Sequence, residues 1–360
     1  MRLAITGLGM LSTLGEDVVT ACAALRAGLS RPAPLRFEVF SPDEESGSAV
    51  VTGHPLKGIA DGYEGVGLYT RLTSQAIQDL VRYAGLTPGD SAFWGATSLY
   101  VCISPPRNNE LGSVIEELFS EHLIPSILDE VGLPIAPART RLLMLGHASV
   151  LTAIHAAGEQ IEAGRGSRAL IVGVDSLVGE DELAWLADHG RLKVAEHVVG
   201  LMPGQASAAV LVEHKPTARR RQARVEAFID GVQPGQEERS RARQQRGSGV
   251  GLATVVARTL KDRRRVAEVY ADLNGEDARA YEWGTALVRL SEAHELPTSI
   301  HTPAVSLGDT GAASGAISIA AAVRSLVRGY AQGDDILVWS SSDTGEVASA
   351  LITRAKGNAE

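Results

Sequence analysis

The sequence predicts an α/β protein, folded as a layered sandwich of two similar halves. This prediction rests on two predicted helices, each of which is apolar on nearly every side and follows a glycine turn. Residues 148–163 have almost no charge before Glu159, and residues 311–327 are mostly alanine, glycine, serine and isoleucine. A helix that is apolar all round is buried between other layers. Each is followed by a glycine stop and an apolar strand, so the chain contains an internal duplication.

The first half is expected to span residues 1–215. Its predicted elements are a strand over 2–6 that enters a glycine turn, helices over 18–29 and 68–83, a strand over 98–104, a helix over 108–131, the buried helix over 148–163, and strands over 167–175 and 206–213. The last two strands are nearly continuous apolar runs, which is typical of a sheet covered on both faces. Residues 31–63 are rich in proline, glycine and polar residues and are predicted to form a loop region with short strands.

The second half is expected to span residues 216–360. It contains a predicted strand over 267–273, the buried helix over 311–327, a strand over 335–340, and its hairpin partner over 347–353. The basic run 215–224 joins the halves. We interpret this run, and the basic runs at 237–246 and 261–265, as solvated connectors and not as nucleic-acid patches.

Composition and charge exclude several classes of partner. The 360 residues carry a formal net charge of -9, which argues against broad binding to nucleic acids or anionic membranes. No run approaches the ~18 apolar residues that a membrane span needs. The apolar start is broken by glycines and is better explained as a strand than as a signal peptide. Cys22 and Cys102, the only cysteines, suggest no disulfide framework. We therefore expect a cytoplasmic protein with no nucleic-acid partner.

Four segments, in this order, resemble the β-ketoacyl synthases of the thiolase superfamily. They are Ile5–Gly15, Gly146–Gly164 with the following Ala169–Asp175, Pro203–Glu213, and Ser306–Ala316. In that family they correspond to the opening strand and turn, the nucleophile turn with its helix and next strand, a glycine-rich strand start, and the glycine–histidine turn of the second half. The resemblance covers nearly the whole chain and implies a thiolase-like αβαβα sandwich.

The resemblance also implies where the catalytic residues should be. The family places a cysteine at a helix start, where the helix dipole and nearby histidines favour the thiolate. This chain has His147 there, and Asn274 and Asp309 at the positions of the two catalytic histidines. Ala304 stands for the family's lysine, and residues 340–345 replace its glycine-rich gate loop. His147, Asn274 and Asp309 are therefore the candidate site.

These replacements predict loss of condensation. The two histidines stabilise an enolate oxygen, which an ionised aspartate would repel, and the loss of one oxyanion donor typically lowers the rate ~10²–10³-fold. Cys22 and Cys102 fall in a predicted helix and strand and are better explained as small buried hydrophobes. If either proved to be the nucleophile, the chain would be an ordinary ketosynthase and the alignment would be wrong.

The first hypothesis is thus a catalytically degenerate, non-condensing β-ketoacyl synthase homologue. It would act as an assembly or partner subunit, like the chain length factors of the family, or as an accessory protein. The expected partners are a second copy or a related ketosynthase, with an acyl carrier protein as a further candidate. Family members are usually dimers through a strand next to the nucleophile helix. Residues 167–175 are apolar enough for that strand or for a central one.

A second hypothesis is an acyl-thioester transferase or hydrolase that uses His147 and Asp309. A histidine oriented by an aspartate is the base half of a Ser-His-Asp arrangement. Ser149 and Ser314 are candidate hydroxyls, although the side chain of Ser149 should point away from His147. The favoured alternative is a buried hydrogen-bonded cluster of His147, Asn274 and Asp309.

No cofactor and no metal site are expected, because His147, His155 and Asp309 lack metal-binding spacing. Residues 272–276, with Arg279 and Glu282, form a dense polar cluster after a predicted strand. We interpret it as a turn, with a site wall as the alternative. Arg279 and Glu282 are three residues apart on the next helix and are expected to pair.

Overall fold

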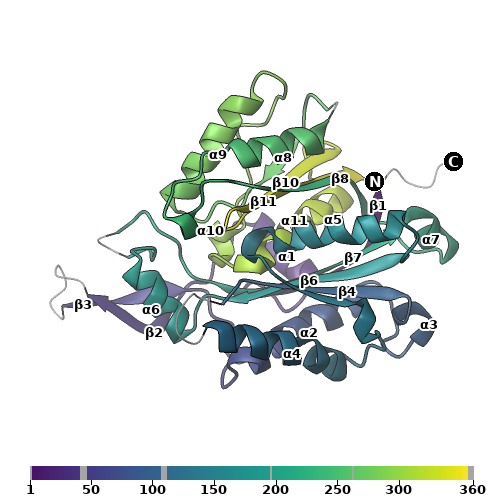
Figure 1. The fold of residues 1–360 in the computed structure, drawn as a ribbon, viewed down its shortest axis with the longest axis horizontal. Helices are drawn as coiled ribbons and strands as arrows, with labels where there is room; N and C mark the ends of the chain where they lie inside the picture. Colours follow the sequence, from purple (N-terminus) through teal and green to yellow (C-terminus); the bar gives the residue numbers. More distant parts are fainter. Residues whose placement is uncertain (1, 41–46, 107–111, 195–196, 262, 356–360) are drawn as a thin grey trace.

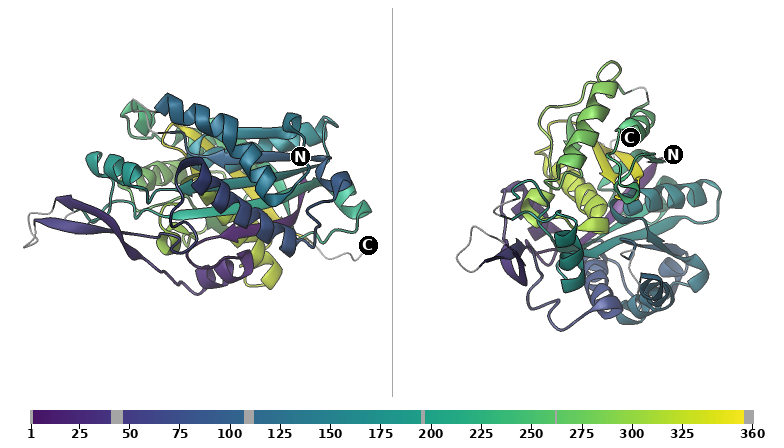
Figure 2. Two further views of the ribbon diagram at one scale, coloured as in Figure 1. Left: turned by 90° about the horizontal axis from the view of Figure 1, so that it is seen from below. Right: turned by 60° about the vertical axis from the view of Figure 1, so that its left-hand side comes forward.

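A mixed sheet runs through the whole molecule. A computed structural model describes residues 2–40, 47–106, 112–194, 197–261 and 263–355. In these residues the sheet has nine strands in the order β5-β4-β6-β7-β1-β8-β11-β10-β9, and β2 and β3 form a separate hairpin. That hairpin extends from one end of the molecule (Figure 2). The strands are β1 (Leu3–Leu11), β2 (Ala33–Phe40), β3 (Ser48–Gly53), β4 (Thr97–Ile103), β5 (Thr140–Met144), β6 (Arg168–Ser176), β7 (Gln205–His214), β8 (Ala227–Gln236), β9 (Glu268–Tyr270), β10 (Asp335–Ser341) and β11 (Glu346–Arg354).

Helices cover the sheet on both sides. They are α1 (Val18–Arg26), α2 (Gly65–Tyr83), α3 (Ser91–Trp94), α4 (Gly112–Val131), α5 (Ser149–Glu162), α6 (Glu180–Asp188), α7 (Lys215–Arg220), α8 (Val250–Leu260), α9 (Asp277–Leu290), α10 (Ala304–Leu307) and α11 (Ser314–Arg328). Short 3₁₀ turns, η2 (Gly146–Ala148) and η4 (Gly311–Ala313), lead directly into α5 and α11.

The arrangement has five layers (Figure 1). On one face, helix α2 packs on β1, β6 and β7, and α4 packs against α2. On the other face, α8 packs on β8 and β11, and α9 packs against α8. Between the two parts of the sheet lie α5 and α11, which contact strands of both. The sheet stays continuous because β1 pairs with β7 along its length and with β8 only at Leu3, Ala4 and Ile5. The prediction of a thiolase-like layered α/β sandwich is thus confirmed.

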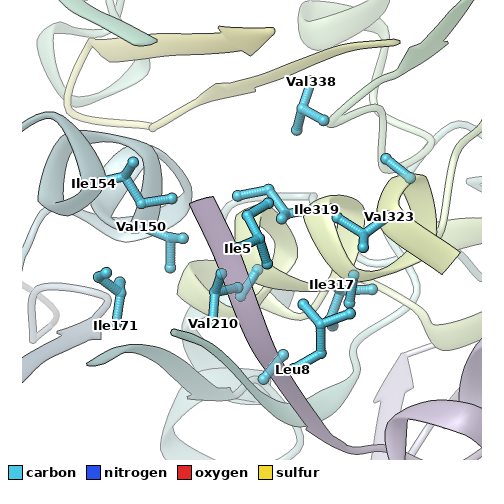
Figure 3. Packing of buried hydrophobic residues seen from close by; sticks show 14 of the residues in the cluster. Ile5, Leu8, Val150, Ile154, Ile171, Val210, Ile317, Ile319, Val323 and Val338 are labelled. Atoms are coloured by element: carbon cyan, nitrogen blue, oxygen red, sulfur yellow. The ribbon is translucent and has the colours of Figure 1, made fainter. Parts of the chain in front are cut away.

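The core lies around the two central helices. Figure 3 shows Ile5 of β1, Val150 of α5, Ile171 of β6, Ile317 of α11 and Val338 of β10 pointing into it, and all five are fully buried. The layers approach so closely that a side chain on one β6 glycine has no room. A Cβ on Gly173 would lie 2.4 Å from the carbonyl oxygen of Ala312. Glycine at position 173 is therefore a packing requirement where β6 meets the start of the second central helix.

Most predicted elements are present, with a few differences. The strand predicted over 267–273 is shorter, because pairing with β10 ends at Tyr270. The described part of the helix predicted over 108–131 begins at Gly112, and residues 108–111 lie outside the described residues. Strand β6 lies between β4 and β7 and is therefore central, whereas β5 forms that edge of the sheet. A boundary between halves at residues 215 and 216 stays a prediction.

Candidate functional site

His147 lies in the turn that connects β5 to α5. Gly146 before it has a φ of +67°, which favours glycine, and brings the chain sharply into the helix. The turn is fixed by Ser342, which directly follows β10. Its Oγ accepts a 2.9 Å hydrogen bond from the Ala148 backbone N–H and donates to the Leu145 carbonyl. His147 is only 7% exposed, so its ring faces the interior.

Asp309 faces His147 from the turn between α10 and η4. Gly308 before it has a φ of +71°, and the Asp309 backbone N–H donates to the Met202 carbonyl at 2.7 Å. The carboxylate oxygen Oδ1 lies 2.7 Å from His147 Nε2 and accepts a 2.9 Å hydrogen bond from the Gly311 backbone N–H. A turn that needs glycine thus positions the carboxylate against the imidazole.

Asn274 completes the predicted trio. It lies in the loop after β9 and donates from Nδ2 to Asp309 Oδ2 at 2.6 Å and to Glu276 Oε2 at 2.9 Å. Its Oδ1 accepts from the Glu276 backbone N–H at 3.1 Å. His147, Asn274 and Asp309 therefore form one buried hydrogen-bonded cluster, although they come from three distant parts of the sequence.

Arg279 of α9 is the residue that sequence reasoning placed wrongly. The expected pairing with Glu282 is absent from the described hydrogen bonds and ion pairs. Arg279 Nη2 instead lies 3.1 Å from His147 Nδ1 and 3.4 Å from Nε2. An atom almost equally far from both ring nitrogens lies over the ring face, because in the plane it would collide with Cε1. Arg279 Nη1 also donates to Asp272 Oδ2 at 3.0 Å, while Glu282 accepts from Ser341 Oγ at 2.9 Å. The buried side of α9 decides these partners.

A second group of charges surrounds this centre. Arg191, only 4% exposed, donates two 2.8 Å hydrogen bonds to Glu276 and one of 2.6 Å to Asp343. Arg241 donates to Glu276 at 2.7 Å. Arg191 lies in the loop after α6 and carries no sequence motif, so nothing in the sequence predicted its role. Asp343 lies in the β10–β11 turn, within the segment expected to replace the gate loop.

The charges in this network balance when His147 is protonated and all four neighbouring carboxylates are ionised. Three arginines, Arg191, Arg241 and Arg279, then join His147 against four carboxylates, Asp272, Glu276, Asp309 and Asp343. Charges buried in such number are tolerated only when they are paired and hydrogen-bonded. The centre is thus an ion-pair network that ties the two parts of the sheet together.

The pKa values follow from these neighbours. Burial and the Arg279 charge alone would lower the pKa of His147, but the carboxylates of Asp309 and Asp272 raise it above its ordinary value. Burial alone would raise the pKa of Asp309, but His147 and Arg279, with the hydrogen bond from Asn274, hold it well below its usual range. The pair is therefore an imidazolium facing a carboxylate.

The hydroxyls and thiols considered from the sequence lie elsewhere. Ser149 Oγ accepts from the Leu145 backbone N–H at 3.0 Å and lies 3.5 Å from the Ile103 carbonyl oxygen. Ser314 Oγ is buried without a hydrogen-bond partner. Cys22 and Cys102 lie in α1 and β4 and belong to the hydrophobic core. Burial raises the pKa of Cys22 to about 12 and raises that of Cys102 further, so both stay neutral thiols.

His155, the other histidine weighed as a metal ligand, places Nδ1 3.2 Å from the Val232 carbonyl oxygen. The described residues contain no group of three or more histidine, cysteine, aspartate or glutamate side chains that could hold a metal ion. Within the same described ranges, no helix is long and apolar enough to span a membrane.

Two cavities lie near the network. One of about 290 Å³ is lined by Arg279, Asp343 and residues 239–241 and 244–247, among others. The other, of about 1080 Å³, is lined by Ile103, Tyr69 and Asp175, among others. Neither of these cavities is lined by His147, as far as the described residues extend.

Comparison with known proteins identifies the fold. No protein-family profile matches the chain, and no curated protein sequence matches it. Solved structures do match. An oxazolomycin ketosynthase domain from Streptomyces albus has a TM-score of 0.78 at 16% identity, over 100% of this chain and 77% of that domain. The chain has the ketosynthase fold.

Two further ketosynthase-fold neighbours match this chain over nearly their full length. The ishigamide ketosynthase/chain length factor has a TM-score of 0.74 at 17% identity, over 99% of each chain. A type II polyketide ketosynthase, solved in complex with its acyl carrier protein and bound to the hexaketide, has a TM-score of 0.74 at 14% identity, over 98% of this chain and 99% of that one. At these identities the likeness concerns the fold, and function must be argued from the site.

Proposed function

We propose that this chain is a non-condensing ketosynthase homologue that serves as a structural partner subunit. One observation carries the proposal: the turn that matches the family's nucleophile turn holds His147, and its ring lies between the Asp309 carboxylate and the Arg279 guanidinium. A side chain whose ring edge and ring face both contact paired charges has a structural role. The position of His147 agrees with a catalytic site that is filled by protein side chains.

The chemistry of condensation argues in the same direction. The nucleophile of the ketosynthase family is a cysteine thiolate, and both thiols of this chain are neutral and in the core. An enolate would need hydrogen-bond donors where Asp309 presents an ionised carboxylate. That charge would repel the developing anion. Asn274 cannot compensate, because both of its described Nδ2 contacts are with carboxylates.

The partner surface that we propose is the free edge of β5. On its other side β5 pairs with β4, and no further strand adjoins it among the described residues. An unpaired edge strand presents backbone groups that a second chain can pair with. This strand, and not β6, leads directly into the His147 turn, as the resemblance to the ketosynthase dimers requires. We infer a related ketosynthase as the partner, with an acyl carrier protein bound by the assembly. The two buried, unpaired thiols agree with a reducing compartment such as the cytoplasm.

The hydrolase alternative has one supporting feature, the 2.7 Å contact between His147 and Asp309. The required hydroxyl is missing from the described contacts of His147, since Ser149 bonds to the backbone instead. The raised pKa of His147 also favours the protonated ring, which cannot accept the proton that a general base must take up. The alternative therefore remains an outcome of the test and is not our proposal.

The test uses the intact protein with acyl-thioesters of several chain lengths. We expect no covalent adduct by mass spectrometry and no release of free acid. The His147→Ala variant should give the same result in both measurements. An adduct on Cys22 or Cys102 would refute the proposal. Acid release that His147→Ala abolishes would establish the hydrolase instead.

A second measurement tests the partner. The protein is co-expressed with a related ketosynthase, and the mixture is examined by light scattering. A proline in place of Leu142 removes one backbone donor from β5 and disturbs this strand. The control is Arg258→Gln, which changes an exposed side chain of α8, and thermal unfolding shows whether each variant is folded. We expect the Leu142→Pro change to abolish the complex. A complex that survives it would refute the β5 interface.

A further inference from the structure

The larger of the two cavities, of about 1080 Å³, has a lining whose inner and outer parts differ in chemistry. It lies between the loop 55–64, the start of α2, and residues 175–182, which join β6 to α6. Parts of β2, α4 and the segment after β4 complete its described lining. The volume is close to the upper end of the ~300–1,000 Å³ typical of ligand pockets. It is therefore large enough for a small molecule.

The buried part of the lining is apolar. Leu56, Ile103, Phe119 and Leu177 all line the cavity, and each is 8% exposed or less. The ring of Phe119 packs edge-to-face against that of Tyr69, with 4.9 Å between the ring centroids. A ligand that enters this part removes apolar surface from water, which favours an aliphatic chain there.

The polar side chains at the same buried end already have partners within the chain. Asp175 accepts from Tyr69 Oη at 2.8 Å and from the Ala312 backbone N–H at 2.9 Å. Gln205 donates from Nε2 to Ser176 Oγ at 3.1 Å. A polar group of a ligand would lose its water here and find these partners engaged, which costs free energy. The inner end of the cavity therefore favours an apolar group over a polar one.

The outer part of the lining is acidic. Four exposed carboxylates and one partly buried carboxylate belong to it, namely Asp61, Glu64, Glu180, Asp181 and Glu182. The cations of the described lining are Arg36 and Lys57, both exposed. Within the described part of the chain, Glu64, Glu180 and Asp181 have no ion-pair partner. An excess of carboxylates around an entrance attracts a cation and repels an anion.

We propose that this cavity binds an aliphatic chain with a cationic head group, with the chain against Leu56, Ile103 and Phe119 and the head group near Glu64 and Glu180. A fatty acid of the same length would fit the apolar part equally well, but its carboxylate would meet like charges at the entrance. The site does not depend on the proposed partner role, and neither the evidence for it nor its test involves His147.

The test compares three probes that share one chain and differ in the charge of the head group: decylammonium, decanol and decanoate. Each is titrated by calorimetry below the concentration at which it forms micelles. We expect saturable binding of one decylammonium per chain, about tenfold tighter than that of decanoate, because several screened charges each contribute a small amount. Decanol should lie between the two.

A series from hexylammonium to dodecylammonium tests the apolar part. Affinity should rise by up to about fourfold for each added methylene, as the burial of one CH₂ group predicts. It should level off once the chain fills the cavity. Ala60→Phe, at a partly buried lining position, should lower the chain length at which this happens.

A double variant, Glu64→Gln with Glu180→Gln, tests the entrance. It should weaken decylammonium binding by about fivefold and leave decanol binding unchanged, because only the charged head group responds to the carboxylates. Glu117→Gln is the matched control, since Glu117 is an exposed carboxylate of α4 outside the described lining. Thermal unfolding shows that each variant is folded, and the double variant keeps the test valid if Ala60→Phe does not fold, because it changes only exposed side chains.

Four results would overturn the proposal. Decanoate binding as tightly as decylammonium would show that the entrance does not select a cation, and no saturable binding of decylammonium would show that the cavity is not a site for it. Affinity that rises along the whole series without levelling off would indicate adsorption to the surface. Binding that the double variant and the Glu117 control affect equally would place the head group elsewhere.

Discussion

Replacing Asp309 by asparagine tests the ion-pair network most directly. The change keeps the size of the side chain but removes the negative charge that His147 faces at 2.7 Å. In the original protein the four positive and four negative groups balance with His147 protonated. In the variant a protonated His147 would leave one buried positive charge unpaired. Breaking a buried pair in this way typically lowers the free energy of unfolding by about 3–5 kcal/mol.

The variant can avoid part of this cost by releasing the His147 proton. Asp309 supplies much of what raises the pKa of His147, and without it burial and Arg279 would lower that pKa below the ordinary value of about 6.5. In the original protein the raised pKa contributes stability that is present below about pH 6.5 and lost as the pH rises through the folded-state pKa. In the variant the sign reverses, so stability falls as the pH drops below about 6.5.

The free energy of unfolding is measured by urea titration at about pH 5.5 and about pH 8, which lie on either side of the ordinary histidine pKa. We expect a loss of about 3–5 kcal/mol at the lower pH. A loss of about 1–2 kcal/mol is expected at the higher pH, where mainly hydrogen bonds to Asn274 and Gly311 are impaired. The control is Asp334→Asn, whose exposed pair with Arg354 should be worth less than about 1 kcal/mol. A loss for the Asp309 variant no larger than the control, or independent of pH, would refute this reasoning.

The remaining predictions concern other buried groups. Cys22 and Cys102 should resist alkylation in the folded protein and react fully in denaturant, as mass spectrometry would show, because burial keeps both thiols neutral; rapid labelling of either would contradict their core positions. His54 is fully buried, neither of its ring nitrogens is hydrogen-bonded, and burial lowers its pKa. His54→Leu should therefore reduce the loss of stability that urea titrations show below about pH 6.5. An unchanged pH dependence would count against this. Glu213 is bonded to Arg221 and to Arg168, so Glu213→Gln should lower the free energy of unfolding by about 3 kcal/mol, and a loss under about 1 kcal/mol would contradict a buried pair. His147→Cys should not gain condensing activity in a radiolabelled malonyl assay, because Asp309 next to it disfavours a thiolate; measurable product would refute the proposed loss of function.

The fold could be predicted because its signals are local. The two central helices are recognisable from their lack of charge, since a helix buried on all sides cannot carry solvated groups. Strands β6, β7 and β10 are recognisable as apolar runs for the same reason. The sequence did not show where β9 ends, because strand pairing decides that boundary. β9 stops at Tyr270, opposite Val338, although β10 continues to Ser341.

The candidate site was predicted in part. His147, Asn274 and Asp309 were found through a resemblance in the turns that carry them, and the structure brings them together. The sequence could not show that Arg279 would contact His147 and not Glu282. Spacing along a helix identifies Glu282 as a possible partner, but it carries no information about a residue from a distant turn. Arg191 has no local signal at all, since its loop is brought to Glu276 only when the two parts of the sheet pack around α5 and α11.

By itself the sequence determined the layered α/β architecture, the absence of a cysteine from the matching turn, and the identity of the three residues in its place. The tertiary structure alone decided that these residues, together with Arg279, Arg191 and Arg241, form one buried ion-pair network. The physical reason is the separation along the chain over which each effect acts. Periodicity and turn chemistry act between near neighbours along the chain, whereas the pairing of buried charges depends on which distant segments the packed core places within a few ångströms of one another.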